Sequence, residues 1–249
     1  MLRVKDLTLA YGAEPVLEGV DVTVDSGRFV SLIGPSGSGK TSVLRAITGL
    51  QKPSAGTISL DVPATDIGFL FQDDALLPWR TARQNVALGL RIRGLARRDA
   101  EAKAEDWLAK LGLAGLGDRY PAQLSGGQRK RVAIAQVLAL EPRFLLMDEP
   151  FASLDAIVRT RITQELIGWV EREHLTVLLV THDLEEAISL SDLIYVLSQG
   201  PRARIRATHE VDIPRPRDVL ATRDHPRFPE LLKKLWDELS AETSFEAVT

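Results

Sequence analysis

The sequence predicts an α/β protein built around a parallel β-sheet. An apolar run without polar alternation, typical of a strand buried on both faces, lies at residues 29–33, and further apolar strands are expected at 144–147, 176–180 and 193–197. Helical stretches such as 160–173 lie between them, and this order of strand, helix and strand indicates parallel pairing. The 249 residues, 45% of them hydrophobic, fit one globular domain or a domain with a lobed insertion.

Further strands are expected before the first apolar run. Apolar residues recur at every second position, or nearly so, at Leu2, Val4, Leu7, Leu9, Val20, Val22 and Val24. A turn at 25–27 ends this group. After the run at 29–33 come a glycine-rich loop and a predicted helix at 41–50, with Val43, Leu44 and Ile47 on one face.

The middle of the chain changes in character. From about residue 76 to 116 it is helical and charged, and we interpret it as an inserted lobe. The predicted organisation is a single domain over residues 1–240, with a helical lobe at about 76–140. Residues 228–239 predict an amphipathic helix, and 241–249 predict a frayed tail.

Composition excludes several classes of protein. The 31 Lys+Arg and 34 Asp+Glu residues leave a formal charge of -3, so we expect no nucleic-acid partner held by bulk charge. The absence of cysteine and the four histidines argue against disulfides, a thiol nucleophile and structural zinc. No apolar run approaches the roughly 20 residues of a membrane span, and the start does not resemble a signal peptide. The chain is expected to stay in the cytosol.

A glycine-rich loop follows the first buried strand and reads Gly34-Pro35-Ser36-Gly37-Ser38-Gly39-Lys40-Thr41. It satisfies the P-loop pattern. Glycines let successive backbone N–H groups surround phosphate oxygens, and the next helix directs its positive end at them. Lys40 adds a mobile charge, and Thr41 a hydroxyl for magnesium. The motif predicts a nucleotide phosphate site, and the alternative is an ordinary strand-to-helix turn.

Two adjacent carboxylates, Asp148 and Glu149, follow the apolar run at 144–147. Because side chains alternate along an extended chain, we expect the two acids to point in different directions. Asp148 is then suited to a magnesium shell, and Glu149 to polarising a water for attack on a γ-phosphate. The alternative is a pair of solvated acids at a strand end.

The segment Leu-Ser-Gly-Gly-Gln at 124–128, called the signature segment below, precedes a helical run. Ser125 and Gln128 have the spacing of a capping box. Two glycines at a helix start cost stability, and the basic residues at 129–131 place positive charge where the helix dipole disfavours it. Both features are consistent with an anion that docks at this helix start.

Three other residues stand where such a site would gather ligands. Gln72 and His182 each follow a predicted strand, at the edge where parallel sheets bind ligands. Tyr11 lies at the end of the first predicted strands. Taken singly, a surface glutamine, a buried hydrogen-bonded histidine and a packing aromatic are the ordinary interpretations.

The order of these features, with Ser153-Leu154-Asp155 between the paired acids and His182, resembles the ATP-binding subunits of ATP-binding-cassette (ABC) transporters. The resemblance runs nearly end to end, and the signature segment is highly specific to that family. It implies a RecA-like P-loop NTPase core, an N-terminal antiparallel β subdomain and an inserted helical subdomain. It also implies an ATPase that uses ATP and Mg²⁺.

The resemblance implies a role for each matching residue. Glu149 would be the general base, His182 a γ-phosphate contact, and Gln72 a contact to magnesium and the attacking water. The implied metal ligands are Thr41, Gln72 and Asp148. The implied nucleotide-binding residues, among them the adenine platform Tyr11, are Tyr11, Gly34, Ser36, Gly37, Ser38, Gly39, Lys40, Thr41, Ser42, Ser125, Gly127, Gln128 and Asp155.

The resemblance also implies partners. In that family two copies stack head to tail, and each ATP lies between the P-loop of one copy and the signature segment of the other, with Asp155 communicating across the interface. A membrane permease inserts a coupling helix near Gln72, which places the chain peripherally at the cytoplasmic face of the inner membrane, and a substrate-binding protein takes part indirectly. Our candidates for the surface that receives the coupling helix are Leu76, Leu77 and Trp79. The alternative is that these side chains pack inside the lobe.

Finer resemblances and departures complete the sequence interpretation. Segments at 75–79, 85–90, 197–201 and 212–218 resemble importers of nitrate, sulfonates and taurine. Gln136 and Ser153 stand where the family commonly has arginine and alanine. A cassette ATPase acting as a soluble factor is the alternative, although such proteins usually carry two cassettes or a coiled-coil insertion. A small-molecule phosphotransferase would leave the signature segment unexplained.

Overall fold

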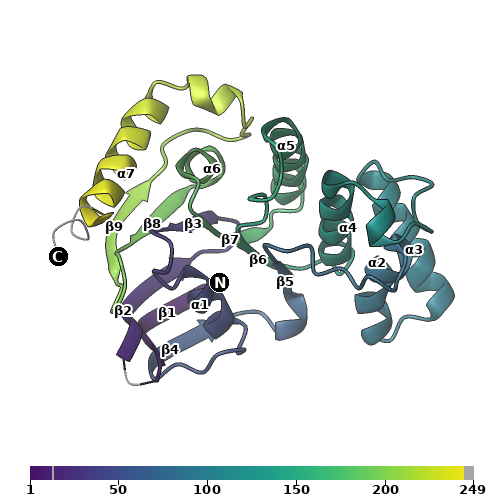
Figure 1. Ribbon diagram of the computed structural model, residues 1–249, viewed down its shortest axis with the longest axis horizontal. Coiled ribbons are helices and arrows are strands. Elements are labelled where there is room, and N and C mark those ends of the chain that lie inside the picture. Colours follow the sequence, from purple (N-terminus) through teal and green to yellow (C-terminus); the bar gives the residue numbers. More distant parts are fainter. Residues whose placement is uncertain (13, 244–249) are drawn as a thin grey trace. The chain divides into compact units, whose positions relative to one another are not determined.

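The computed structural model describes residues 1–12 and 14–243 (Figure 1). The chain divides into two compact units, one formed by Met1–Ala64 with Leu166–Thr249 and the other by Thr65–Glu165. The first unit contains β1 (Leu2–Tyr11), β2 (Glu14–Val24), β3 (Phe29–Ile33), α1 (Lys40–Ile47), β4 (Ala55–Leu60), β7 (Thr176–Thr181), α6 (Leu184–Leu190), β8 (Leu193–Leu197), β9 (Ile205–Glu210) and α7 (Arg227–Thr243). The helix α5 (Ala156–Arg172) begins in the second unit and ends in the first.

Strands β2, β1 and β4 of the first unit form an antiparallel sheet in that order. Leu2 lies opposite Val24 on one side and Leu60 on the other. Leu2 and Val4 are buried while Arg3 is exposed, so the alternation in the sequence marks the inward face. The expected N-terminal antiparallel strands are therefore confirmed.

Strand β3 lies between β7 and β8 in parallel register, and β9 adds an antiparallel edge. All residues of β3 and β7 are buried, which explains why their sequences do not alternate. Ile33 of β3, Ile188 of α6 and Leu235 of α7 share one hydrophobic core, and both helices lie along this sheet in Figure 1. The core holds Ile33, the last residue of β3, after which the P-loop begins.

The second unit contains β5 (Ile67–Leu70), α2 (Ala82–Ile92), α3 (Arg97–Lys110), α4 (Gly126–Leu138) and β6 (Phe144–Asp148). The three helices pack on one another, and β5 pairs with β6 in parallel. A Cβ at Gly68 would lie 2.6 Å from a methyl group of Val137, so α4 approaches the backbone of β5 closely. The unit is longer than the lobe expected at 76–140, because it includes this strand pair. The single domain over 1–240 stays a prediction.

The predicted C-terminal helix at 228–239 is confirmed as α7, which begins at Arg227. Of the tail predicted to fray, residues 241–243 end this helix and 244–249 lie outside the described residues. Within residues 1–12 and 14–243, none of the helices combines the length and hydropathy of a bilayer span.

Candidate active site

The P-loop connects β3 to α1 through two glycines with left-handed backbone, Gly37 at φ 78° and Gly39 at φ 93°. Gly39 is also the N-cap of α1, where no side chain caps the helix. A Cβ at Gly39 would lie 2.8 Å from Leu17 Cδ2, so packing as well as backbone conformation requires glycine. The helix α1 therefore begins directly after this curved loop, and a helix N-terminus is where backbone amide groups favour an anion.

Polar groups inside the P-loop suit a phosphate. The Lys40 side chain is buried, and its Nζ donates to the carbonyl oxygens of Gly34 and Pro35 at 2.8 Å each. The buried Ser38 Oγ finds no hydrogen-bond partner among the described residues. A buried ammonium, an orphaned hydroxyl and an uncapped helix start together favour an oxyanion ligand.

Tyr11 is held beside this loop with its ring 55% exposed. Its hydroxyl donates to Gln51 Oε1 at 2.6 Å and lies 3.1 Å from Ser42 Oγ on α1. The hydroxyl of Tyr11 is therefore held by hydrogen bonds while much of the residue stays exposed. Its role as an adenine platform stays a prediction.

The structure brings His182 to the same sheet edge as the P-loop. Ile33 and Thr181, the last residues of β3 and β7, lie side by side in the parallel register. His182 follows directly and is exposed, so the interpretation of it as a buried histidine is wrong. Asp183 then caps α6 by accepting from the Glu186 amide at 3.0 Å. This is the carboxyl edge at which parallel sheets place their ligands.

The second unit brings together the other predicted catalytic residues. Leu70 of β5 lies opposite Met147 of β6, so Gln72 and Asp148 leave the same edge of this strand pair. Asp148 is 7% exposed, whereas Gln72 is exposed. The two halves of the predicted site, P-loop with His182 and Gln72 with the paired acids, thus each form within one unit.

Glu149 corrects one argument made from the sequence. The strand ends at Asp148, and Glu149 has φ 42°, in the left-handed region. The expectation that the two acids alternate along extended chain is therefore wrong, because the chain turns between them. A left-handed conformation costs a non-glycine residue about 1–2 kcal/mol. Such strain often accompanies functional residues.

The signature segment forms the N-terminus of α4, with Ser125 as N-cap. Ser125 Oγ accepts from the Gln128 amide at 3.3 Å, and Gln128 Oε1 accepts from the Ser125 amide at 2.9 Å, which confirms the capping box. A Cβ at Gly127 would lie 2.7 Å from Val158 Cγ1, so its own chain explains that glycine. At Gly126 the nearest atom would be 3.8 Å away. The surroundings in the described chain therefore do not require glycine there.

The basic residues at 129–131, which follow the signature segment, are not all explained by a docking anion. Lys130 pairs with Asp74 at 2.9 Å, and Arg131 with Glu165 at 2.6 Å. Two of these charges are therefore balanced inside the unit, and the expectation that they await an anion is wrong for them. Arg129 also reaches Asp74, at 3.5 Å, and is 40% exposed.

The remaining predicted residues lie on loops of the second unit. Asp155 caps α5, since its Oδ1 accepts from the Val158 amide at 3.0 Å. Trp79 is 70% exposed, so packing inside the lobe is excluded for it, while Leu76 and Leu77 are half-buried. The role of this surface in permease contact stays a prediction.

Sequence reasoning missed the residue that shapes this loop, Asn85 of α2. Asn85 is fully buried, and its Nδ2 donates to the carbonyl oxygens of Leu77, Arg80 and Thr81 at 3.0–3.2 Å. Its Oδ1 accepts from the Leu77 amide at 2.7 Å. An asparagine inside an amphipathic helix was the available signal, because a buried amide must find such partners. Asn85 therefore holds the turn from which Trp79 projects.

Comparison with known proteins decides the family. The family model described as "ABC transporter" matches residues 17–152, from within β2 to just beyond the paired acids. The chain belongs to the ABC transporter family. This ABC cassette is 44% identical, over 97% of its length and 92% of the relative's, to the aliphatic sulfonates import ATP-binding protein SsuB 2 of Rhizobium johnstonii. It is also 41% identical to the bicarbonate transport ATP-binding protein CmpC of Synechococcus elongatus. That match covers 93% of this chain but only 36% of the length of CmpC.

Comparison with solved structures supports the same family assignment. It superposes with a TM-score of 0.75 and 32% identity on a dimeric ATP-binding cassette in a post-hydrolysis state, bound to ADP and Pi. The match covers 86% of this chain and 100% of that one. The RecA-like core with an antiparallel β subdomain and a helical subdomain, expected from the sequence, is confirmed by this likeness.

The cassette's residues fit magnesium that arrives with ATP. Among the described residues, no three His, Cys, Asp or Glu side chains gather closely enough to hold a metal by themselves. Magnesium instead keeps several waters and uses one or two carboxylates together with substrate phosphates. The buried carboxylate of Asp148 and the hydroxyl of Thr41, at the start of α1, are donors of that kind.

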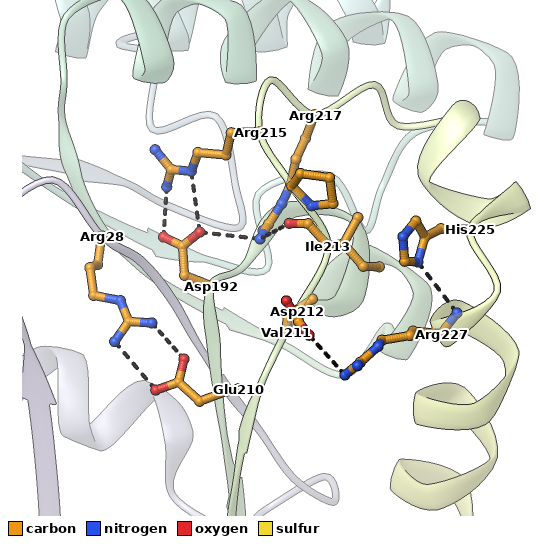
Figure 2. Close-up of a pocket in the computed structure, with 11 residues that line it drawn as sticks. Arg28, Asp192, Glu210, Val211, Asp212, Ile213, Arg215, Arg217, His225 and Arg227 are labelled. Atoms are coloured by element: carbon orange, nitrogen blue, oxygen red, sulfur yellow. Dashed lines mark hydrogen bonds and ion pairs between the residues drawn. The ribbon is translucent and has the colours of Figure 1, made fainter.

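A separate pocket of about 1040 Å³ lies at the amino ends of β3 and β8 (Figure 2). Asp192 accepts there from Arg215 at 2.7 Å and from the buried Arg217 at 3.2 Å, while Arg28 pairs with Glu210 at 2.6 Å. Burial lowers the pKa of Arg217, and Asp192 opposes that shift. These ion pairs tie the segment after β9 to the sheet. The pocket is at the opposite end of β3 from the P-loop, so it is not part of the candidate active site.

Proposed function

We propose that this cassette is the ATP-binding and ATP-hydrolysing subunit of an ABC importer, working as a head-to-tail pair of copies. One observation carries the proposal: the same chain holds a P-loop suited to phosphate and an exposed signature segment whose Gly126 its own chain does not require. A second copy that presents its nucleotide to Gly126 accounts for that glycine. The dimeric ATP-binding cassette with ADP and Pi bound supports the pairing.

In this proposal the P-loop binds the ATP phosphates, with Lys40 as the cation. Thr41, Asp148 and Gln72 would hold Mg²⁺, which neutralises charge on the phosphate oxygens. Glu149 accepts a proton from the attacking water, and His182 contacts the γ-phosphate. Tyr11 stacks on the adenine.

From the opposite copy, Ser125, Gly127 and Gln128 would complete the site, and Asp155 would lie where the copies communicate. Binding of ATP closes the pair, and hydrolysis with release of phosphate reopens it.

The cargo class follows from the relatives. Those compared are named for import or transport of aliphatic sulfonates, bicarbonate and sulfate or thiosulfate. All of these are small oxyanions, so we propose a small oxyanion as the cargo. Because the relatives are importer subunits, they support an importer over a soluble factor. A substrate-binding protein would deliver the cargo to the permease.

Gly126 gives a test of the composite site. We expect Gly126→Ala to keep or raise the melting temperature, because an added Cβ meets no atom closer than 3.8 Å and alanine loses less conformational entropy than glycine on folding. We expect the same change to lower ATP hydrolysis about tenfold or more. The matched control is Gly168→Ala in α5, where nothing lies within 4 Å of an added Cβ. Equal hydrolysis rates in the two variants would argue against a ligand at Gly126.

The exposed turn around Trp79 is our proposed permease contact, and the permease would hold the chain at the cytoplasmic face of the membrane. We expect Trp79→Ala to reduce the amount of membrane subunits that copurify in mild detergent, because it removes an exposed aromatic anchor. The control is Trp236→Ala on α7, whose side chain is similarly exposed, 64% against 70%. Copurification of the Trp79 variant at the wild-type level would remove this surface from the proposal.

A further inference from the structure

We propose that Lys130 is a positioning residue for catalysis, which fixes the backbone of Gln72 through a buried ion pair with Asp74. The inference deepens the proposed function and rests on it, because Gln72 is there a contact to magnesium and the attacking water. It assigns a task to a lysine on the signature helix α4 that the family resemblance leaves without one.

Lys130 is fully buried, with 1% of its side chain exposed. An ammonium group carries three N–H donors, and a buried one is costly unless they are satisfied. The three acceptors around Nζ are Asp74 Oδ1 at 2.9 Å, the Gln72 carbonyl oxygen at 3.1 Å and the Phe71 carbonyl oxygen at 3.5 Å. All three belong to the stretch 71–74. The lysine therefore binds this loop as a whole and not one side chain.

The contact acts on Gln72 through the main chain. The Gln72 side chain is exposed, whereas its carbonyl oxygen accepts from the buried ammonium. Holding the carbonyl fixes the backbone from which the side chain projects. Arg129 adds a second, weaker contact to the other carboxylate oxygen of Asp74, at 3.5 Å. Asp74 is thus held by two successive residues of α4.

The consequence concerns both nucleotides of a pair. Helix α4 begins with the signature segment, which in the proposed function meets the nucleotide held by the other copy. The same helix, through Lys130, sets Gln72 in the chain's own site. A displacement of α4 on contact with the other copy's nucleotide would therefore move Gln72, which couples the two sites by one contiguous contact.

The experiment compares Lys130→Met, which keeps side-chain length and removes the charge, with Arg131→Met as the matched control. Arg131 is the next residue of α4 and pairs with Glu165 and the Leu111 carbonyl oxygen, away from the Gln72 loop. We expect Lys130→Met to lower kcat about tenfold or more and to raise severalfold the Mg²⁺ concentration needed for half-maximal rate. Affinity for ATP, measured directly, should stay within about twofold, because the P-loop is intact.

A second variant guards against loss of folding. Lys130→Met alone leaves the Asp74 carboxylate without its buried cation, so Lys130→Met with Asp74→Asn removes both charges. If the pair acts as one unit, the double variant should show the same defect in Mg²⁺ dependence as either single change, not the product of the two.

Two results would overturn the inference. One is a wild-type kcat and Mg²⁺ dependence in the double variant, and the other is the same change in Mg²⁺ dependence in Arg131→Met. A wild-type chain that binds ATP but never hydrolyses it, alone or with its membrane partners, would overturn the proposed function instead and with it the role of Gln72.

Discussion

Glu149→Gln is expected to lower the rate of ATP hydrolysis about 10²-fold or more while the chain still binds ATP. Glutamine keeps the size of the side chain and one acceptor oxygen, but it cannot accept a proton from the attacking water. The P-loop is unchanged, so affinity for ATP is retained. The ATP-bound pair should therefore accumulate in its closed form.

The measurement is steady-state release of phosphate, together with the dimer fraction by size-exclusion chromatography in ATP and Mg²⁺. Glu141→Gln is a matched control, because Glu141 is another glutamate of the same unit with left-handed backbone, φ 51° against 42° for Glu149. Its partner is Lys103, at 2.6 Å. Turnover in Glu149→Gln equal to that of the control would refute the assignment of the base.

Sequence patterns that involve only neighbouring residues predict much of the fold and half of the candidate site. Buried parallel strands reveal themselves by apolar runs without alternation, as at β3 and β7. The P-loop and the capping box at Ser125 depend on residue types at fixed short spacing, so the sequence alone predicts both. Gln72 and His182 follow from the general rule that ligands gather at the carboxyl ends of parallel strands.

What sequence reasoning missed depends on contacts between distant residues. The Nζ of Lys130 bonds to a carbonyl oxygen 58 positions earlier, and no local pattern records that pairing. When the pairing of Lys130 is not known, the basic residues at the start of α4 suggest that an anion binds there. The error at Glu149 has a related reason, because a strand's last residue cannot be read from composition, and alternation fails one residue beyond it.

Asn85 and Trp79 show the same limit at the surface. A tryptophan is usually buried, which makes packing inside the lobe the ordinary expectation for Trp79. The four hydrogen bonds of Asn85 hold the preceding turn, and Trp79 stays 70% exposed. The buried amide of Asn85, six positions further along the chain, thus holds the turn that leaves Trp79 exposed.

The second large effect concerns the sharing of sites between copies. Lys40→Ala removes the cation of the P-loop, and Ser125→Arg places a bulky side chain at the signature segment. Each variant alone should lose nearly all ATP hydrolysis, because in a symmetric pair every site then contains the defect. Neither change should unfold the chain, since Ser125 is exposed and Lys40 is the first residue of α1, directly after a loop whose backbone is set by its glycines.

Mixing the two inactive variants tests the central claim most directly. In a pair that contains one of each, one site combines the intact P-loop of the Ser125→Arg chain with the intact signature segment of the Lys40→Ala chain. An equal mixture should hydrolyse ATP at about a quarter of the wild-type rate, because half of the pairs are mixed and each has one complete site. A mixture that hydrolyses no more ATP than the separate variants would contradict a site shared by two copies.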